Sequence, residues 1–156
     1  MSASETRKLL IVDDDEGIQR QLRWAFSDVK ASVAGSRGEA LEKVRRDPPQ
    51  VVILDLAMPP DLEGPGEGFA ALEEILAFDP LIRVIVASGN DERENAVMAI
   101  KLGAYDFCSK PVDLDVLKLI VDRAFYLHGL ETEIRRMKAP PRAAPLKNFI
   151  TEDKEL

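Results

Sequence analysis

Five short apolar runs, each followed by a longer segment with helical spacing, constrain the fold of this chain more than any other feature. The runs cover residues 8–12, 31–34, 51–54, 82–87 and 105–108. They are apolar nearly throughout, which is typical of parallel strands whose two faces are both covered by helices. This strict alternation predicts an α/β fold: a doubly wound, five-stranded parallel sheet with five helices and right-handed crossovers.

Signals at the helix ends support this reading of the chain. Ser36 followed by Glu39 is typical of a capping box at the start of the second helix. Asp91 opens the fourth helix, and Gly103 lies at its expected C-terminal cap. The pattern of the fifth helix continues well past Leu127, so we expect this helix to be extended.

Length and composition exclude several classes of protein. The 156 residues are enough for one domain with a real core and a short tail. The net charge of −7 argues against binding of nucleic acids or anionic membranes through bulk charge. One cysteine and one histidine exclude an intramolecular disulfide framework, a multi-cysteine zinc site and a histidine cluster. With neither an apolar run of membrane-spanning length nor a signal peptide in the sequence, we expect a cytoplasmic protein without membrane contact.

Polar side chains follow four of the five apolar runs. Ligands of open α/β sheets bind outside the carboxyl ends of the strands. The residues at those ends share one predicted edge of the sheet: Asp13, Asp14, Asp55, Ser88 and Lys110. Each of them alone has an ordinary explanation, since an aspartate after a strand often caps a helix and Ser-Gly or Lys-Pro often forms a turn.

Together these residues indicate metal and phosphoryl chemistry. Carboxylates crowded at one edge repel one another, and a cation compensates that repulsion. Oxygen ligands without histidine or cysteine suit Mg²⁺. A metal held by carboxylates beside an ammonium group and a hydroxyl is suited to a phosphoryl group, because the cations offset its charge and the hydroxyl donates a hydrogen bond.

From residue 8 to about residue 130 the sequence resembles the receiver domain of two-component response regulators. Four motifs occur in the expected order on four strand ends. They are Asp13-Asp14 in LLIVDDDE, Asp55 in VVILDLAMP, Ser88 in VIVASG and Lys110-Pro111 in DFCSKP. Each motif alone is weak, whereas the ordered set is specific.

The resemblance implies a role for each matching residue. Asp55 would be phosphorylated by a sensor histidine kinase, and Lys110 would contact the phosphoryl group across a cis bond to Pro111. Ser88 would be the switch hydroxyl, and Phe107 the aromatic residue that turns with it. Mg²⁺ would be bound by the residues that match the family's metal ligands: Asp13, Asp14, Asp55 and the backbone carbonyl of Ala57. The loop at 59–68 is longer than is usual in the family; it is either a solvated loop or a contact for a specific partner.

The resemblance also suggests how the chain is divided and what it controls. Residues 1–130 would be the receiver, and residues 131–156 a helical extension, a proline-rich linker and the possible start of a truncated AAA+ output domain. The extended last helix and the tail are similar to the nitrogen-regulator class of sigma-54-dependent activators, including regulators of PEP-CTERM systems. The receiver would then control transcription, with DNA bound only by an output domain outside this sequence.

The fifth helix also predicts a homodimer. Ile120, Ala124, Leu127 and Ile134 follow near-heptad spacing. An apolar stripe that continues beyond the receiver core requires a partner. A solvated helical linker remains the alternative for this segment.

Other functions stay open or are disfavoured. A single-domain receiver that acts by protein contact or as a phosphorelay shuttle differs only in whether the gene continues past Leu156. An aspartate-based phosphatase would need a second aspartate two residues after its nucleophile, but Ala57 stands there. A flavodoxin-like electron carrier would need a phosphate-binding loop after the first strand, which is absent from the sequence. We therefore expect a signalling switch that assists its own phosphoryl transfer rather than an enzyme.

Overall fold

A computed structural model describes residues 6–60, 64–89 and 93–138 of the chain. Five parallel strands form one sheet in the order β2-β1-β3-β4-β5. The strands are β1 (Lys8–Val12), β2 (Lys30–Ala34), β3 (Val51–Leu54), β4 (Arg83–Ser88) and β5 (Asp106–Ser109). The predicted fold class is confirmed, and each predicted strand differs from the observed one by at most one residue at either end.

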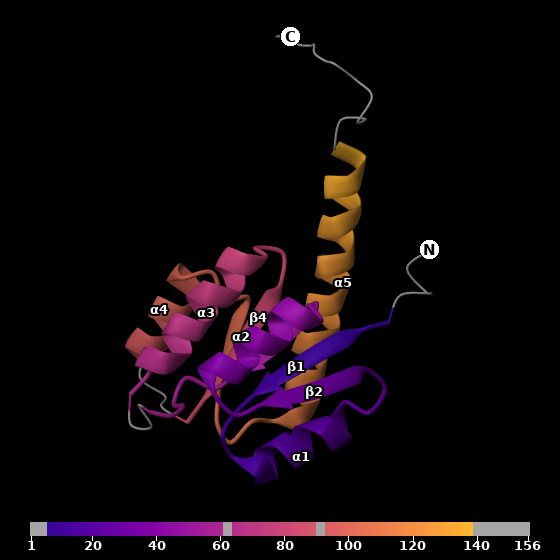
Figure 1. Cartoon of the computed structure of the whole chain (residues 1–156). Coiled ribbons are helices and arrows are strands. Elements are labelled where there is room, and N and C mark those ends of the chain that lie inside the picture. The colour runs from indigo at the N-terminus through magenta and orange to yellow at the C-terminus, as the bar shows by residue number, and fades with distance from the viewer. Residues whose placement is uncertain (1–5, 61–63, 90–92, 139–156) are drawn as a thin grey trace.

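Helices cover both faces of the sheet (Figure 1). The helices α1 (Glu16–Ala25) and α5 (Leu114–Lys138) pack on one face; α2 (Arg37–Arg46), α3 (Gly66–Phe78) and α4 (Arg93–Lys101) pack on the other. Strand β1 divides its side chains between the two layers, with Leu10 and Val12 in one core and Leu9 and Ile11 in the other. Burial on both faces explains why the strands are apolar without alternation.

Local hydrogen bonds fix the helix ends. The Ser36 hydroxyl accepts from the backbone N–H of Glu39, while the Glu39 carboxylate accepts from the N–H of Gly35. The expected cap of α2 is therefore confirmed. Gly103 follows α4 with a φ of 111°, a left-handed conformation that favours glycine. The predicted start of the fourth helix at Asp91 lies outside the described residues.

Helix α5 is continuous to Lys138 and projects beyond the sheet (Figure 1). An ion pair between Arg83 and Glu131 links this helix to the start of β4, with 3.8 Å between Nη2 and Oε2. The domain boundary at residue 130 stays a prediction, and the tail from 139 to 156 lies outside the described residues. Among the helices of the described part, none has the combination of length and hydrophobicity needed to cross a bilayer.

The predicted dimer stripe on α5 needs a correction. Ala124 is completely buried against the sheet, and Ile120 packs on the same core. Ala124 is therefore unavailable to a second chain, and Ile120 is partly covered by the core of this one. Ile134 of the predicted stripe is exposed, as expected. The other exposed large apolar side chains of α5 were not part of that stripe: Val116, Leu119, Tyr126, Leu130 and Met137.

The chain makes a tight backbone approach where α3 begins. A Cβ placed on Gly68 would lie 2.3 Å from Leu56 Cα and 2.7 Å from the Leu56 carbonyl oxygen. The N–H of Gly68 donates to that carbonyl at 3.0 Å. This contact ties α3 to the segment that directly follows Asp55.

We expect Gly68→Ala to lower the free energy of unfolding by about 2 kcal/mol or more, because the new methyl group meets backbone that cannot move aside. Gly38→Ala is the matched control, since nothing lies within 4 Å of a Cβ on this helical glycine. It should raise the free energy of unfolding by about 0.5–1 kcal/mol. Urea unfolding of both variants checks the pair; equal effects would contradict the described approach of α3 to Leu56.

Candidate functional site

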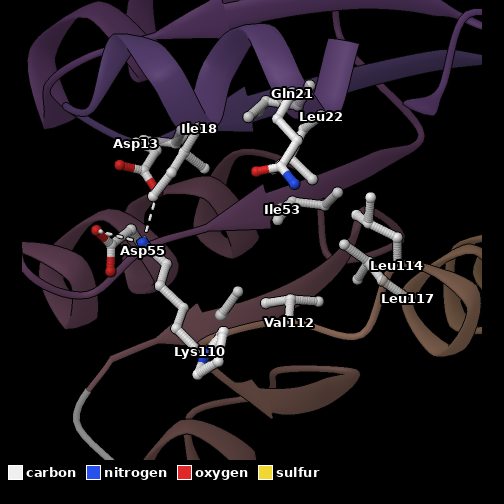
Figure 2. Close-up of a pocket in the computed structure, with 14 residues that line it drawn as sticks. Asp13, Ile18, Gln21, Leu22, Ile53, Asp55, Lys110, Val112, Leu114 and Leu117 are labelled. Carbon is white, nitrogen blue, oxygen red and sulfur yellow. Dashed lines mark hydrogen bonds and ion pairs between the residues drawn. The ribbon is translucent and has the colours of Figure 1, made fainter. Parts of the chain in front are cut away.

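Three strand ends bring two carboxylates and one ammonium group together. Asp13 follows β1, Asp55 follows β3 and Lys110 follows β5. Lys110 Nζ lies 2.7 Å from Asp13 Oδ2 and 3.3 Å from Asp55 Oδ2 (Figure 2). Residues separated by as many as 97 positions in sequence thus form one charged cluster at the predicted edge of the sheet.

Burial makes these charges interact strongly. Asp13 and Asp55 are buried, and the Lys110 side chain is about 20% exposed. Burial raises the pKa of Asp55 above its ordinary value; the Lys110 ammonium lowers it and the Asp13 carboxylate raises it again. For Lys110, burial lowers the pKa, but its hydrogen bond to Asp13 and the charge of Asp55 outweigh burial and raise it. The three groups carry a net charge of −1 when all are ionised.

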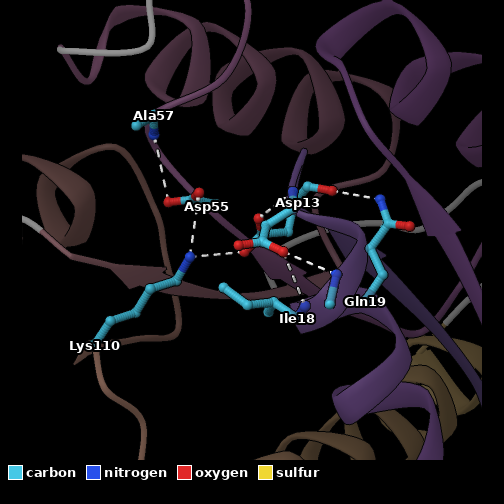
Figure 3. A network of polar contacts seen from close by, with 8 residues as sticks. Asp13, Ile18, Gln19, Asp55, Ala57 and Lys110 are labelled. Carbon is cyan, nitrogen blue, oxygen red and sulfur yellow. Dashed lines mark hydrogen bonds and ion pairs between the residues drawn. The ribbon is translucent and has the colours of Figure 1, made fainter.

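Backbone and amide groups hold the two carboxylates in place (Figure 3). Asp13 Oδ1 accepts from the N–H of Asp15 at 2.9 Å, and Asp55 Oδ1 accepts from the N–H of Ala57 at 3.4 Å. The Gln19 side-chain amide donates to the Asp13 carbonyl at 2.5 Å. Sequence reasoning missed Gln19, because no motif marks an amide one turn into a helix as part of a site.

Three carboxylates are close enough to share a cation. Oxygens of Asp13, Asp14 and Asp55 lie within 4.8 Å of one another, with Asp14 exposed and the other two buried. The set consists of oxygen donors alone, which fits a hard divalent cation such as Mg²⁺. Ala57 is half-buried two residues after Asp55, so its backbone is near this cluster.

The third aspartate of the DDD run has a different role. Asp15 is the N-cap of α1, and its side chain accepts from the N–H groups of Gly17 and Ile18 at 2.8 and 3.3 Å. The ordinary explanation of an aspartate after a strand is therefore correct for Asp15. It does not apply to Asp13, whose side chain pairs with Lys110 instead.

The predicted switch residues lie on neighbouring strands. Ser88 ends β4 and is buried, and its carbonyl accepts from the N–H of Lys110 at 2.8 Å. Phe107 pairs with Val86 of β4 and packs on the core beneath α2, α3 and α4. The peptide bond between Lys110 and Pro111 is cis.

One acidic residue of the long loop region has a structural partner. Glu67 Oε1 accepts from Arg37 Nε at 3.0 Å, and Arg37 Nη1 also pairs with Glu74 at 2.9 Å. These ion pairs join the first turn of α2 to α3. Glu67 therefore belongs to the packing of helices; loop residues 61–63 lie outside the described part of the chain.

A family model described as the response regulator receiver domain matches residues 9–122. Regulatory protein AtoC of Escherichia coli (strain K12) is 36% identical over 132 residues, covering 83% of this chain and 28% of AtoC. Nitrogen assimilation regulatory protein NtrX of Azorhizobium caulinodans is 34% identical over 133 residues, again covering 83% of this chain and 28% of the relative. The chain thus spans little more than a quarter of the length of these relatives.

Solved structures give the same result. The receiver domain of NtrX from Brucella abortus superimposes with a TM-score of 0.66 at 35% identity, covering 74% of this chain and 96% of that one. The signal receiver domain of a putative Luxo repressor protein from Vibrio parahaemolyticus gives 0.76 at 26% identity, covering 83% and 98%. The resemblance noted from the sequence motifs is confirmed by these matches.

The raised pKa of Asp55 predicts that ionisation of this carboxyl lowers the free energy of unfolding. Because folding favours the protonated carboxyl, stability is lost as pH rises from the unfolded pKa of about 4 through the raised folded pKa. Asp55→Asn imitates the protonated form, so its melting temperature without metal should exceed that of the wild type by about 3 °C at pH 7. The difference should shrink toward pH 4. Melting curves between pH 4 and 7 check this; a difference independent of pH would contradict it.

Proposed function

Because this chain belongs to the response regulator receiver domain family, we propose that it is a phosphorylation-dependent switch in which Asp55 accepts a phosphoryl group from a sensor histidine kinase. The observation that carries the proposal is the Lys110 ammonium, which bridges the Asp13 and Asp55 carboxylates. A carboxylate is a weak nucleophile, and a cation fixed beside it stabilises charge on the group being transferred.

The proposal gives the remaining site residues separate roles. Asp13, Asp14, Asp55 and the carbonyl of Ala57 would hold Mg²⁺, which supplies positive charge to the phosphoryl oxygens. Lys110 contributes a second positive charge, and its ion pairs hold it directly beside Asp55. The donor set supports this role, since its three carboxylates converge without any competing soft ligand.

Ser88 and Phe107 would couple phosphorylation to a change in the surface of the domain. Ser88 ends β4, which lies next to β3, the strand that Asp55 follows. Phe107 lies on β5, on the other side of β4. We propose that the Ser88 hydroxyl binds the phosphoryl group and that Phe107 repacks with it. The surface formed by α4, β5 and α5 then changes shape.

The output is proposed to be transcriptional. The relatives include transcriptional regulatory protein ZraR of Escherichia coli, 34% identical over 131 residues, and the NtrX nitrogen regulator described above. Residues 131–156 would connect the receiver to an output domain of the sigma-54-dependent class, which would bind DNA in the cytoplasm. A single-domain receiver or phosphorelay shuttle remains the alternative, and a gene that ends at Leu156 would favour it.

Phosphorylation at Asp55 is tested by intact mass after treatment with acetyl phosphate and Mg²⁺. Wild type should gain one labile phosphoryl group, whereas Asp55→Asn should gain none because its amide is not a nucleophile. Asp79→Asn is the matched control, since this aspartate ends α3 far from the cluster and should leave labelling unchanged. Full labelling of Asp55→Asn would overturn the assignment.

The exposed side of α5 supports a homodimer with a different seam from the one expected from the sequence. Val116, Leu119, Tyr126, Leu130 and Met137 are exposed and follow alternating steps of three and four, with Arg123 and Glu133 at the two remaining positions. This spacing places them along one side of the helix. We propose that two chains pair in parallel through this stripe, weakly because it is short and interrupted by charges.

Leu130→Glu should raise the dimer dissociation constant by about tenfold or more, because a charge would be buried in the seam. Phe78→Glu is the matched control: this apolar side chain is similarly exposed but lies at the end of α3. Sedimentation velocity with and without beryllofluoride measures both variants. A wild type that is monomeric in both states at high micromolar concentration would reduce the α5 extension to a linker.

A further inference from the structure

A cavity of about 460 Å³ lies beside the phosphorylation site (Figure 2). It is bounded by α1, by the carboxyl ends of β1, β3 and β4, and by the segment that leads from β5 into α5. Its volume falls within the range of roughly 300–1,000 Å³ that is typical of small-molecule sites. Neither the phosphoryl chemistry nor the proposed dimer uses the apolar part of this space.

The cavity has an apolar body. Aliphatic side chains from the α1 and α5 layer form its walls, among them Ile18, Leu22, Ile53, Val112 and Leu117. The β4 wall is contributed by Ala87, whose small side chain leaves the space open.

Polar side chains line the cavity in two different places. Asp13, Asp55 and Lys110 line one end, while Gln21 lines another part of the wall and is itself exposed to solvent. Figure 2 shows the Gln21 amide turned toward the space above Ile53. Exposed residues that also line the cavity mark its opening, and Gln21 and Pro111 both meet this description, so a ligand would enter between α1 and the segment after β5.

The charged end selects the class of ligand. Asp13 and Asp55 carry two negative charges against one positive charge on Lys110, and that ammonium is already paired with both carboxylates. Anions are repelled there, whereas a donor with a positive charge finds carboxylate acceptors. A ligand with an apolar body and a cationic group at one end would therefore complement the cavity.

We propose that this cavity binds a small aromatic or alkyl amine, with its ring or chain among the aliphatic walls and its ammonium group at the Asp13 and Asp55 end. Because those carboxylates also belong to the cation site, amine and divalent cation compete. The ligand therefore opposes phosphorylation, a consequence that rests on the proposed function. Amine binding itself does not depend on phosphorylation and can fail or succeed independently.

Tryptamine tests the proposal, with indole-3-acetate as its anionic counterpart on the same ring. Titrations of the full chain, without metal or phosphodonor, are followed by calorimetry and by amide chemical shifts. Tryptamine should bind at micromolar to low millimolar concentration and shift the amides of Ile18, Leu22 and Val112. Indole-3-acetate should bind at least tenfold more weakly than tryptamine. Added Mg²⁺ should lower the affinity of the protein for tryptamine.

Two aromatic substitutions on and after α1 supply the structural control. Gln21→Phe should obstruct the opening and weaken tryptamine at least tenfold. Ser27→Phe adds the same ring at an exposed position that does not line the cavity, and should leave affinity unchanged. If Gln21→Phe does not fold, Ala87→Val reduces the cavity from the opposite wall and should weaken binding in the same way.

Three results would overturn the proposal: no binding of tryptamine to wild type at millimolar concentration, equal binding of both indoles, or equal affinities in Gln21→Phe and Ser27→Phe. The proposed function is tested separately by the mass experiment on Asp55. Loss of amine binding with intact phosphorylation therefore rejects only the ligand site. Amine binding without any phosphorylation rejects the proposed function, and with it the effect of the amine on phosphorylation, but not the ligand site.

Discussion

The buried ammonium of Lys110 is the interaction on which this site depends. Two carboxylates at neighbouring strand ends would repel each other in a desolvated position, and Lys110 lies within 3.3 Å of both. Charges removed from water are tolerated when each has a close partner, and removing one partner leaves an uncompensated buried charge. The cluster remains net negative, so it still attracts a divalent cation and repels anions until such a cation is bound.

The sheet order makes this arrangement possible. Strands β1 and β3 are neighbours, so Asp13 and Asp55 emerge side by side, and β5 delivers Lys110 from the far edge. Strand β4 lies between β3 and β5, and the long lysine side chain reaches past it to both carboxylates (Figure 3). The contact between Gly68 and Leu56 fixes the chain just beyond Asp55, because a larger residue would push α3 away. Apolar packing on both faces of the sheet thus positions the polar groups at its edge, which themselves contribute little to the core.

The sheet and the site edge could be predicted from sequence because their signals are local. Continuous apolar runs mark strands buried on both faces, and parallel strands place all their carboxyl ends at one edge. The roles within the DDD run were less accessible, since only side-chain direction separates the cap Asp15 from the lysine partner Asp13. Ala124 was wrongly included in the α5 stripe, because apolar residues occur on several sides of that helix. Spacing alone does not decide which side packs on the sheet, and the structure buries Ala124.

The strand that ends at the switch hydroxyl also carries the contact to the helical extension. Ser88 ends β4, while Arg83 begins it and pairs with Glu131 of α5. The Arg83 guanidinium lies 5.8 Å from the ring centre of Tyr105, the residue directly before β5, which carries Phe107. Ser88 and Arg83 therefore lie at the two ends of one hydrogen-bonded strand. This chain of contacts gives the site a physical connection to the part of α5 that leaves the domain, through the two strands that hold both proposed switch residues.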